Sequence, residues 1–195
     1  MPEETRDVRW AAIQYVFLDR DGVINRKLPE GKYVTRWEEL ELLPGVGDAI
    51  DELNRSGHKV ILVTNQRGVA LGWMTDAEVE GIHVRLREEL AGSSAWLDGI
   101  YYCPHDREEC DCRKPRTGMI EAAFRDFPGA EPGNSILIGD SLSDMECGRA
   151  AGMATILIES TTASEIENRK PDSTAARGIA DAMATSLSDA VHRLL

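Results

Sequence analysis

The sequence predicts an α/β fold in which a doubly wound, mostly parallel sheet is flanked by helices. Three apolar runs have no polar interruption, as in parallel strands buried on both faces; they cover residues 16–18, 60–63 and 136–138. Segments with apolar residues at helical spacing separate the runs, and this alternation favours a doubly wound sheet. The runs end in Asp19, Thr64 and Asp140. Because ligands bind beyond the carboxyl ends of such strands, we expect these side chains to meet at one edge.

The expected strands are short and rich in apolar, β-branched or aromatic residues. In chain order they cover residues 15–18, 59–63, 100–103, 135–139 and 154–158. Between them, three stretches lack a clear period and are predicted to be loops over the strand ends, at residues 25–39, 66–74 and 103–113.

The expected helices are delimited by start and stop signals. Pro44 and Gly45 open the first helix, which Gly57 ends. Thr75 and Glu78 form a capping box that starts the second, which runs to about residue 91. Two further helices are predicted at 117–127 and 143–151. Near-helical apolar spacing over 178–195 predicts a closing helix, with a short strand before it as the alternative.

The size and composition favour one soluble globular domain over residues 1–195. Its 42% hydrophobic and 29% charged residues are ordinary for that class. A formal net charge of −12 argues against nucleic acid and anionic membranes as partners. The chain shows neither a long apolar run nor a basic-then-apolar signal at its beginning, so we expect it in the cytoplasm. Its four cysteines are then expected as metal ligands or core residues rather than disulfides.

Two aspartates, Asp19 and Asp21, follow the first apolar run one residue apart. Their mutual repulsion favours a divalent cation between them, and carboxylate oxygens suit Mg²⁺. Gly22 allows a tight turn beside the pair. Asp140 adds a third acid at the same predicted edge. The alternative for an isolated Asp-x-Asp is a loop with two solvated acids.

The same edge offers groups that suit a phosphoryl substrate. Thr64 and Asn65 supply hydroxyl, amide and backbone N–H donors, and Lys114 supplies a positive charge beside Pro115. A carboxylate nucleophile, a metal, a cation and hydrogen-bond donors suffice for phosphoryl transfer, which depends mainly on positioning and charge stabilisation. An aspartate can carry the phosphoryl group covalently before water releases it.

A cysteine cluster occupies the predicted loop at 103–112. Cys103, His105, Cys110 and Cys112 provide a complete four-ligand set for a closed, structural Zn²⁺ site. The alternative is a reduced Cys-x-Cys pair or a chance cluster. Because Cys112 directly precedes Arg113 and Lys114, we hypothesise that zinc holds these two side chains in position.

Four ordered motifs resemble those of the haloacid dehalogenase (HAD) superfamily. They are Asp19-Arg20-Asp21-Gly22-Val23, Thr64-Asn65-Gln66, Arg113-Lys114-Pro115 and Gly139-Asp140-Ser141-Leu142-Ser143-Asp144. The resemblance spans residues 15 to about 158 and implies a Rossmann-like sheet. The gaps between motifs leave no room for the large cap domain that many members carry, so an open cleft is expected.

The resemblance also implies roles for the motif residues. Asp19 would be the nucleophile and Asp21 the general acid and base. Thr64 and Lys114 would bind the transferring phosphate. Mg²⁺ would be held by Asp19, the Asp21 backbone carbonyl and Asp140, while Asp144 would support the metal site or Lys114.

Within the superfamily, the zinc loop joined to Cys112-Arg113-Lys114-Pro115 is similar to the branch of heptose-bisphosphate and histidinol phosphatases. Residues 65–75 favour the heptose enzymes, whereas the short zinc-loop spacer is more similar to histidinol phosphatases, and Ser141 stands where the heptose enzymes often have a basic residue. The substrate would be a small phosphorylated sugar. The residues expected to bind it are Asn65, Gln66, Arg67 and Arg113.

The favoured function is therefore Mg²⁺-dependent removal of the C7 phosphate of a heptose 1,7-bisphosphate, in the synthesis of nucleotide-activated heptose and surface glycans. Histidinol-phosphate hydrolysis is the near alternative, and an idle, zinc-stabilised binding scaffold is the remote one. A monomer is expected. Trp37 and Trp73 lie in predicted rim loops, where they either contact the sugar or fasten the loops.

Overall fold

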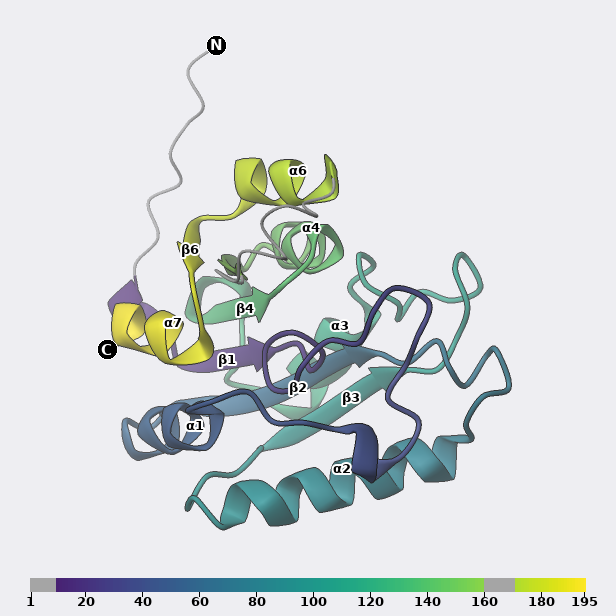
Figure 1. Cartoon of the computed structure of the whole chain (residues 1–195). Helices are drawn as coiled ribbons and strands as arrows, with labels where there is room; N and C mark the ends of the chain where they lie inside the picture. The colour runs from purple at the N-terminus through teal and green to yellow at the C-terminus, as the bar shows by residue number, and fades with distance from the viewer. Residues whose placement is uncertain (1–9, 160–170) are drawn as a thin grey trace.

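The described part of the chain builds one six-stranded, all-parallel sheet (Figure 1). The computed structural model describes residues 10–159 and 171–195. Residues 1–9 and 160–170, which the single-domain prediction includes, lie outside the described residues. The strand order is β3-β2-β1-β4-β5-β6. The strands are β1 (Tyr15–Leu18), β2 (Lys59–Asn65), β3 (Gly99–Cys103), β4 (Ser135–Gly139), β5 (Ala154–Ile158) and β6 (Ala182–Ala184).

Helices cover both faces of this sheet. On one face, apolar residues of α1, α2 and α7 join those of the strands in the largest core cluster. On the other face, α3, α4 and α6 close two smaller clusters. The α/β fold predicted from the sequence is thus confirmed. The helices are α1 (Val46–Arg55), α2 (Asp76–Ala91), α3 (Gly118–Asp126), α4 (Leu142–Ala150), α6 (Pro171–Ile179) and α7 (Leu187–Leu194).

Strand β1 is apolar throughout because its alternate side chains enter different clusters. Val16 and Leu18 belong to the cluster with α1, whereas Phe17 belongs to the cluster with α3. Each of the three is fully buried. A strand covered on both faces has no solvent side, which explains the continuous apolar run.

The site edge lies where the winding of the sheet reverses. The chain runs outward from β1 through β2 to β3 and then returns to β4 on the other side of β1. Leu18 pairs with Leu62 on β2 and with Ile138 on β4, so the three strands end together. The strands point the same way, and the loops after β1 and β3 gather beyond their tips (Figure 1). A crevice at such a switch point is where doubly wound sheets bind ligands.

The connection from β1 to β2 contains a loop, the short 3₁₀ helix η2 (Trp37–Glu39) and α1. Within residues 10–159 and 171–195, no separate cap domain covers the strand ends, as predicted. The loop is fastened at its base, because Arg26 N donates to the Glu41 carbonyl and the Arg26 guanidinium pairs with the Glu41 carboxylate.

The closing segment differs from a single helix. Helix α6 ends at Ile179, β6 pairs in parallel with β5, and only then does α7 begin. Asp181 accepts hydrogen bonds from the backbone and hydroxyl of Thr155, which anchors the turn before β6. The short strand, kept as the alternative, is therefore correct. Apolar spacing could not distinguish it because a strand of three residues is too short to show a period.

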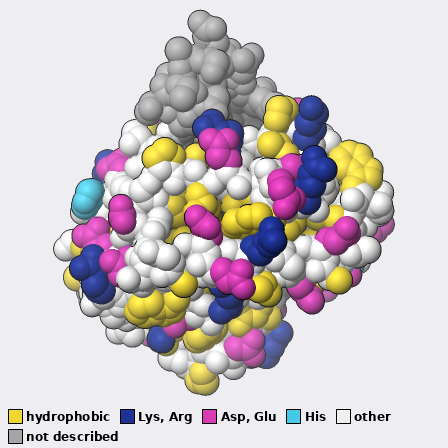
Figure 2. Space-filling view, turned by 60° about the horizontal axis from the view of Figure 1, so that its bottom comes forward, with side chains coloured by type: hydrophobic (Ala, Val, Ile, Leu, Met, Phe, Trp, Pro, Cys, Tyr) yellow, Lys and Arg dark blue, Asp and Glu magenta, His cyan; other side chains and the backbone are white. Residues whose placement is uncertain are grey.

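The face of the molecule shown in Figure 2 carries charges of both signs. In Figure 2, acidic and basic side chains are interspersed, with small groups of apolar side chains between them. Among the helices of the described ranges, none combines the length and apolar character that crossing a membrane requires.

Candidate active site

Three acids and one lysine meet at the carboxyl edge of the sheet. Asp19 follows β1, Asp140 follows β4, and Asp144 lies on α4; one carboxylate oxygen from each lies within 4.8 Å of the others. Lys114, from the loop after β3, places its Nζ 2.8 Å from Asp19 Oδ1 and 2.6 Å from Asp144 Oδ1. Lys114 Nζ also donates to the Val63 carbonyl at 2.8 Å. The structure thus brings together residues separated by more than a hundred positions, as the strand ends predicted.

The electrostatics of this cluster favour a cation. Burial raises the pKa of Asp19 to about 7; Lys114 opposes the shift, and the neighbouring acids add to it. Burial also raises the pKa of Asp140, against the charge of Lys27. The Asp144 pKa is lowered, because Lys114 outweighs the cost of burial. Asp19 and Asp140 thus resist ionisation, and with Asp144 they form a set of hard oxygen ligands that fits a divalent ion such as Mg²⁺.

The Asp21 carboxylate is held by donors from three residues. Arg20 Nη2 approaches its two oxygens at 3.2 and 3.0 Å, Asn25 Nδ2 donates at 2.9 Å and Gln66 Nε2 at 3.3 Å. Burial opposes ionisation, but the Arg20 charge and these hydrogen bonds outweigh it and lower the Asp21 pKa. The Arg20 side chain is completely buried, so it supports Asp21 from within the protein.

The two amides at the end of β2, Asn65 and Gln66, face inward more than the sequence suggested. Asn65 was expected to bind substrate, but its amide forms two hydrogen bonds with the backbone of Lys114, accepting from the N–H at 3.0 Å and donating to the carbonyl at 3.1 Å. Gln66 is buried and donates to the hydroxyl of Thr64 at 2.9 Å. Both atoms of the Asn65 amide and the Nε2 of Gln66 are thus engaged with Lys114, Thr64 and Asp21, and binding of substrate by these two amides stays a prediction.

The two arginines expected at the rim differ in their surroundings. Arg67 forms a two-pronged ion pair with Asp106, with Nε–Oδ1 at 2.6 Å and Nη2–Oδ2 at 3.1 Å. The hydrogen bonds with Asp106 and then with Tyr33 raise the pKa of Arg67 above its ordinary value. Arg113 has a longer hydrogen bond, from Nη1 to the His105 carbonyl at 3.5 Å. Arg67 therefore ties the loop after β2 to the loop that carries the cysteine cluster, while Arg113 is held less tightly.

The two rim tryptophans also differ. Trp37 packs against the largest core cluster, which fastens its loop to the body. Trp73 packs edge-on against Tyr33, with ring centroids 5.5 Å apart, and remains 54% exposed.

Lys27 is a site residue that sequence reasoning missed. Its Nζ lies 2.8 and 2.6 Å from the two carboxylate oxygens of Asp140. No signal in the sequence points to it, because the loop at 25–39 has no period and the match of the first motif ends at Val23.

The cysteine cluster is assembled as a four-ligand site. The sulfur atoms of Cys103 and Cys112 lie 3.5 and 3.3 Å from that of Cys110, and His105 Nδ1 lies 3.7 Å from Cys103 Sγ and 3.3 Å from Cys112 Sγ. Zn–S bonds of about 2.3 Å in a tetrahedron put sulfur atoms roughly 3.8 Å apart. The cluster is therefore compatible with structural zinc. Cys103 is also the β-ladder partner of Asn65, so the two sites lie at adjacent strand ends.

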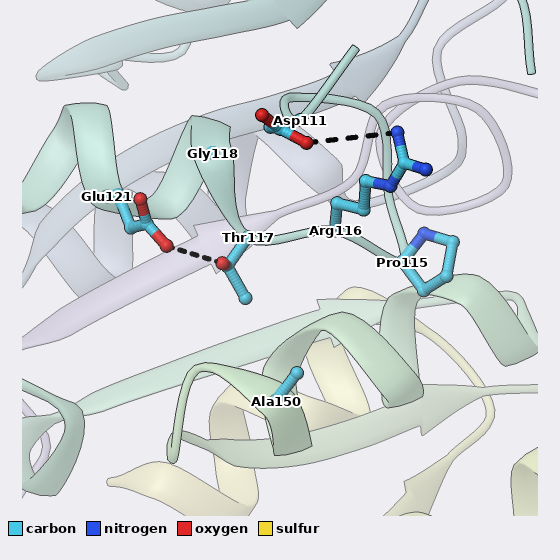
Figure 3. Close-up of a pocket in the computed structure, with 7 residues that line it drawn as sticks. All are labelled: Asp111, Pro115, Arg116, Thr117, Gly118, Glu121 and Ala150. Carbon is cyan, nitrogen blue, oxygen red and sulfur yellow. Dashed lines mark hydrogen bonds and ion pairs between the residues drawn. The ribbon is translucent and has the colours of Figure 1, made fainter. Parts of the chain in front are cut away.

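A cavity of about 570 Å³ lies apart from this chemistry, between the start of α3 and the end of α4. In Figure 3, Asp111 faces Arg116, and Thr117 donates a hydrogen bond to Glu121. None of the acids, lysines or cysteines described above lines this cavity. Its lining residues are Asp111, Pro115, Arg116, Thr117, Gly118, Glu121 and Ala150.

Comparisons with known proteins place these features in one family. A HAD-hydrolase-like family model matches residues 111–190. The chain is 46% identical over 132 residues to D-glycero-alpha-D-manno-heptose-1,7-bisphosphate 7-phosphatase of Mycobacterium bovis, covering 67% of this chain and 69% of that protein. It is 37% identical over 186 residues to D-glycero-beta-D-manno-heptose-1,7-bisphosphate 7-phosphatase of Salmonella typhi, covering 91% and 93%.

A solved structure agrees with these relatives. The crystal structure of D,D-heptose 1,7-bisphosphate phosphatase from B. bronchiseptica, complexed with magnesium and phosphate, matches with a TM-score of 0.80 and 28% identity, covering 93% of this chain and 98% of that chain. Sequence similarity and fold therefore extend over nearly the whole length. The chain belongs to the D-glycero-D-manno-heptose-1,7-bisphosphate 7-phosphatase family of HAD-like hydrolases.

Proposed function

We propose that this chain is a Mg²⁺-dependent phosphatase that removes the C7 phosphate of D-glycero-D-manno-heptose 1,7-bisphosphate. The observation that carries the proposal is the contact of Lys114 with both Asp19 and Asp144, beside Asp140. The arrangement joins a nucleophile, a cation and a set of acids suited to a metal. The substrate is supported by the activities named for the relatives in Mycobacterium bovis and Salmonella typhi.

In the first step, an Asp19 carboxylate oxygen attacks the phosphorus atom. A new O–P bond forms on Asp19 as the bond from phosphorus to the C7 oxygen breaks, and Asp21 donates a proton to the departing oxygen. Although the Arg20 charge and the hydrogen bonds outweigh burial and lower the Asp21 pKa in the free site, the negative phosphoryl group opposes its ionisation and favours the protonated acid. Lys114 stabilises the negative charge of the phosphoryl oxygens.

In the second step, Asp21 takes a proton from a water molecule, whose oxygen attacks the phosphorus atom. The Asp19 carboxylate is released and inorganic phosphate leaves. Asp19, Asp140 and the Asp21 backbone carbonyl would hold Mg²⁺, which when bound supplies positive charge to the phosphoryl oxygens. Thr64 directly follows Val63, whose carbonyl accepts a hydrogen bond from Lys114. The Thr64 hydroxyl donates to the same phosphoryl oxygens.

The remaining residues act around this centre. Asn65 positions Lys114, and Gln66 positions Thr64 and Asp21. Arg113 binds the phosphate on C1, since a substrate with two phosphates needs a cation away from the reacting one and Arg suits phosphate oxygens. Arg67 supports that rim through Asp106.

Structural zinc at Cys103, His105, Cys110 and Cys112 orders the loop that delivers Arg113 and Lys114. We further propose that residues 1–195 form one domain that acts as a monomer in the cytoplasm. Its partner is the small phosphorylated sugar, without nucleic acid or membrane.

The decisive experiment is ³¹P NMR of heptose 1,7-bisphosphate during turnover, with each C1 anomer separately and with histidinol phosphate for comparison. We expect loss of the C7 phosphate signal, dependence on Mg²⁺, and no turnover by Asp19→Asn. Equal or faster hydrolysis of histidinol phosphate, or loss of the C1 phosphate, would contradict the proposal. Absence of hydrolysis of any phosphoester would favour the scaffold alternative.

A further inference from the structure

Lys27 delivers a positive charge to the acid cluster from a different loop than Lys114. Its ammonium contacts both oxygens of Asp140, at 2.8 and 2.6 Å, across more than a hundred residues of sequence. The Asp140 side chain is mostly buried, with 14% exposed, whereas that of Lys27 is 54% exposed. The acid is therefore fixed, and the lysine reaches it from the solvent side.

The backbone beneath Lys27 is anchored on both sides. The preceding residue, Arg26, is bound to Glu41 through its backbone and its guanidinium. The following residue, Leu28, packs against the largest core cluster. The anchored backbone places Lys27 within reach of Asp140. The exposed lysine side chain can still adopt other rotamers and leave the carboxylate.

The Gly22 backbone restricts the position of the Asp140 carboxylate on the side away from Lys27. The backbone of Gly22 lies so close that a Cβ atom there would be 2.2 Å from Asp140 Oδ2. The carboxylate is confined between Gly22 on one side and Lys27 on the other. A cation that binds Asp140 must therefore share it with Lys27 or displace the ammonium.

We propose that Lys27 is an exchangeable counter-ion: it competes with the divalent cation for Asp140 in the free enzyme and binds a phosphoryl oxygen once substrate is present. This inference rests on the proposed function for its second half. The cluster holds the carboxylates of Asp19, Asp140 and Asp144 against two ammonium groups, those of Lys27 and Lys114. Removing one lysine therefore leaves a stronger negative field that attracts a metal ion. The same removal takes one positive charge away from a dianionic phosphate. The two affinities are expected to change in opposite directions.

The test measures metal and anion binding separately in Lys27→Met, a change that keeps an unbranched side chain, one atom shorter, and removes its charge. Mn²⁺ serves as the spectroscopic substitute for Mg²⁺, and its Kd is measured by electron paramagnetic resonance without substrate. Inorganic phosphate is then titrated at saturating Mg²⁺ by calorimetry. We expect the Mn²⁺ Kd to fall about tenfold and the phosphate Kd to rise about tenfold, as expected for one charge near the ligand in a partly exposed site.

Lys32→Met is the matched control, because Lys32 is an exposed lysine on the same loop. Lys32→Met carries the same change of net charge. It should leave the Mn²⁺ Kd and the phosphate Kd within about twofold of the wild type, since an exposed charge outside the site is screened. An unchanged Mn²⁺ Kd in Lys27→Met, or weaker binding of both ligands, would overturn the proposal; the latter would mean that Lys27 only holds the loop. Because the Mn²⁺ measurement needs no sugar substrate, its result stands even if the heptose assay fails.

Discussion

At the scale of single residues, Lys114 shows how one side chain can organise a site. An ammonium group has three donors, and the three acceptors around Nζ are Asp19, Asp144 and the Val63 carbonyl. These lie after β1, on α4 and on β2. Burial lowers the pKa of Lys114, but the two carboxylates outweigh it and the net shift is upward, so the lysine remains charged. The sequence placed Lys114 in a motif but could not reveal that it links three elements.

Gly22 should be intolerant of any side chain. Its φ is +102°, and a Cβ atom would lie 2.2 Å from Asp140 Oδ2. We expect Gly22→Ala to displace Asp140 and lower kcat/KM by roughly a hundredfold, because misplacing a reacting group by about 1 Å has an effect of that order. Steady-state kinetics at saturating Mg²⁺ measure this.

Gly31→Ala separates backbone strain from the clash. Gly31 has a φ of +79°, but a Cβ atom there would meet nothing within 4 Å. Gly31→Ala should therefore lower the stability of the folded chain through backbone strain and leave kcat/KM unchanged. Similar kinetics for the two variants would argue against a role of Gly22 in shaping the acid cluster.

The raised pKa of Asp19 predicts how stability depends on pH. Its pKa is about 7 in the folded chain against an ordinary 3.8. The native state therefore keeps a proton that the unfolded chain releases, and this carboxyl group destabilises the fold as pH rises from about 4 to about 7. Without divalent cations, Asp19→Asn should stabilise the protein at pH 8 by on the order of 3 kcal/mol.

The measurement is chemical denaturation of wild type and Asp19→Asn in the presence of a chelator, at pH 8 and at pH 4. The advantage of the variant should shrink at pH 4, where the native carboxyl group is protonated. An advantage of the same size at both pH values would show that it does not come from the ionisation of Asp19.

At the scale of elements, the predicted helix starts are confirmed, because they depend on residues that are close together in the chain. The capping box of Thr75 and Glu78 is present at the start of α2. Thr117 occupies the N-cap position of α3, but its hydroxyl donates to Glu121 instead of accepting from the backbone. The strand β6 was only an alternative in the prediction, because its pairing with β5 is a long-range contact that spacing along the chain does not encode.

The loop that carries the cysteine cluster should control the active site through Lys114. Two backbone hydrogen bonds join the ends of β2 and β3 and their loops, from Gln66 N to the Cys103 carbonyl and from Ala70 N to the Pro104 carbonyl. We expect Cys110→Ser to lose bound zinc, to melt at a lower temperature and to lower kcat about tenfold, because positioning of the phosphate-binding lysine is lost. Atomic absorption and kinetics measure the two effects on the same sample.

Cys147→Ser is the control for that experiment. Cys147 is a buried cysteine that lies outside the four-ligand cluster and contacts the Arg116 carbonyl. It should retain zinc and nearly full kcat. Full zinc content and normal turnover in Cys110→Ser would refute the proposed coupling.

At the scale of the whole molecule, metal binding and folding should be linked. An ion that binds only the folded chain stabilises it by about 2.7 kcal/mol at a hundred times its Kd. We expect Mg²⁺ to raise the Tm of the wild type, and the rise to be lost in Asp140→Asn, since the acid set forms only when β1, β4 and α4 come together. Differential scanning calorimetry with and without Mg²⁺ provides the test; an equal rise in the variant would place the ion elsewhere.

The sequence could predict the site to the extent that strand ends define it. Asp19, Thr64 and Asp140 follow apolar runs, and parallel strands bring their ends to one edge. Side-chain partners in the loops were not predictable, because they depend on how separate loops meet. Lys27 on Asp140 and Asp106 on Arg67 are two such pairs. Asn65 shows the same limit, since a motif position does not say whether an amide faces a ligand or the neighbouring backbone.

The paired hydrogen bonds between Asn65 and the Lys114 backbone have a consequence for catalysis. An amide side chain presents a donor and an acceptor side by side, as the edge of a strand does, so Asn65 extends the ladder of the sheet into the following loop. These two hydrogen bonds position the Lys114 backbone before any ligand arrives. Little reorganisation of charge is left for the moment of bond breaking, which is the condition under which fixed electrostatic groups accelerate a reaction most.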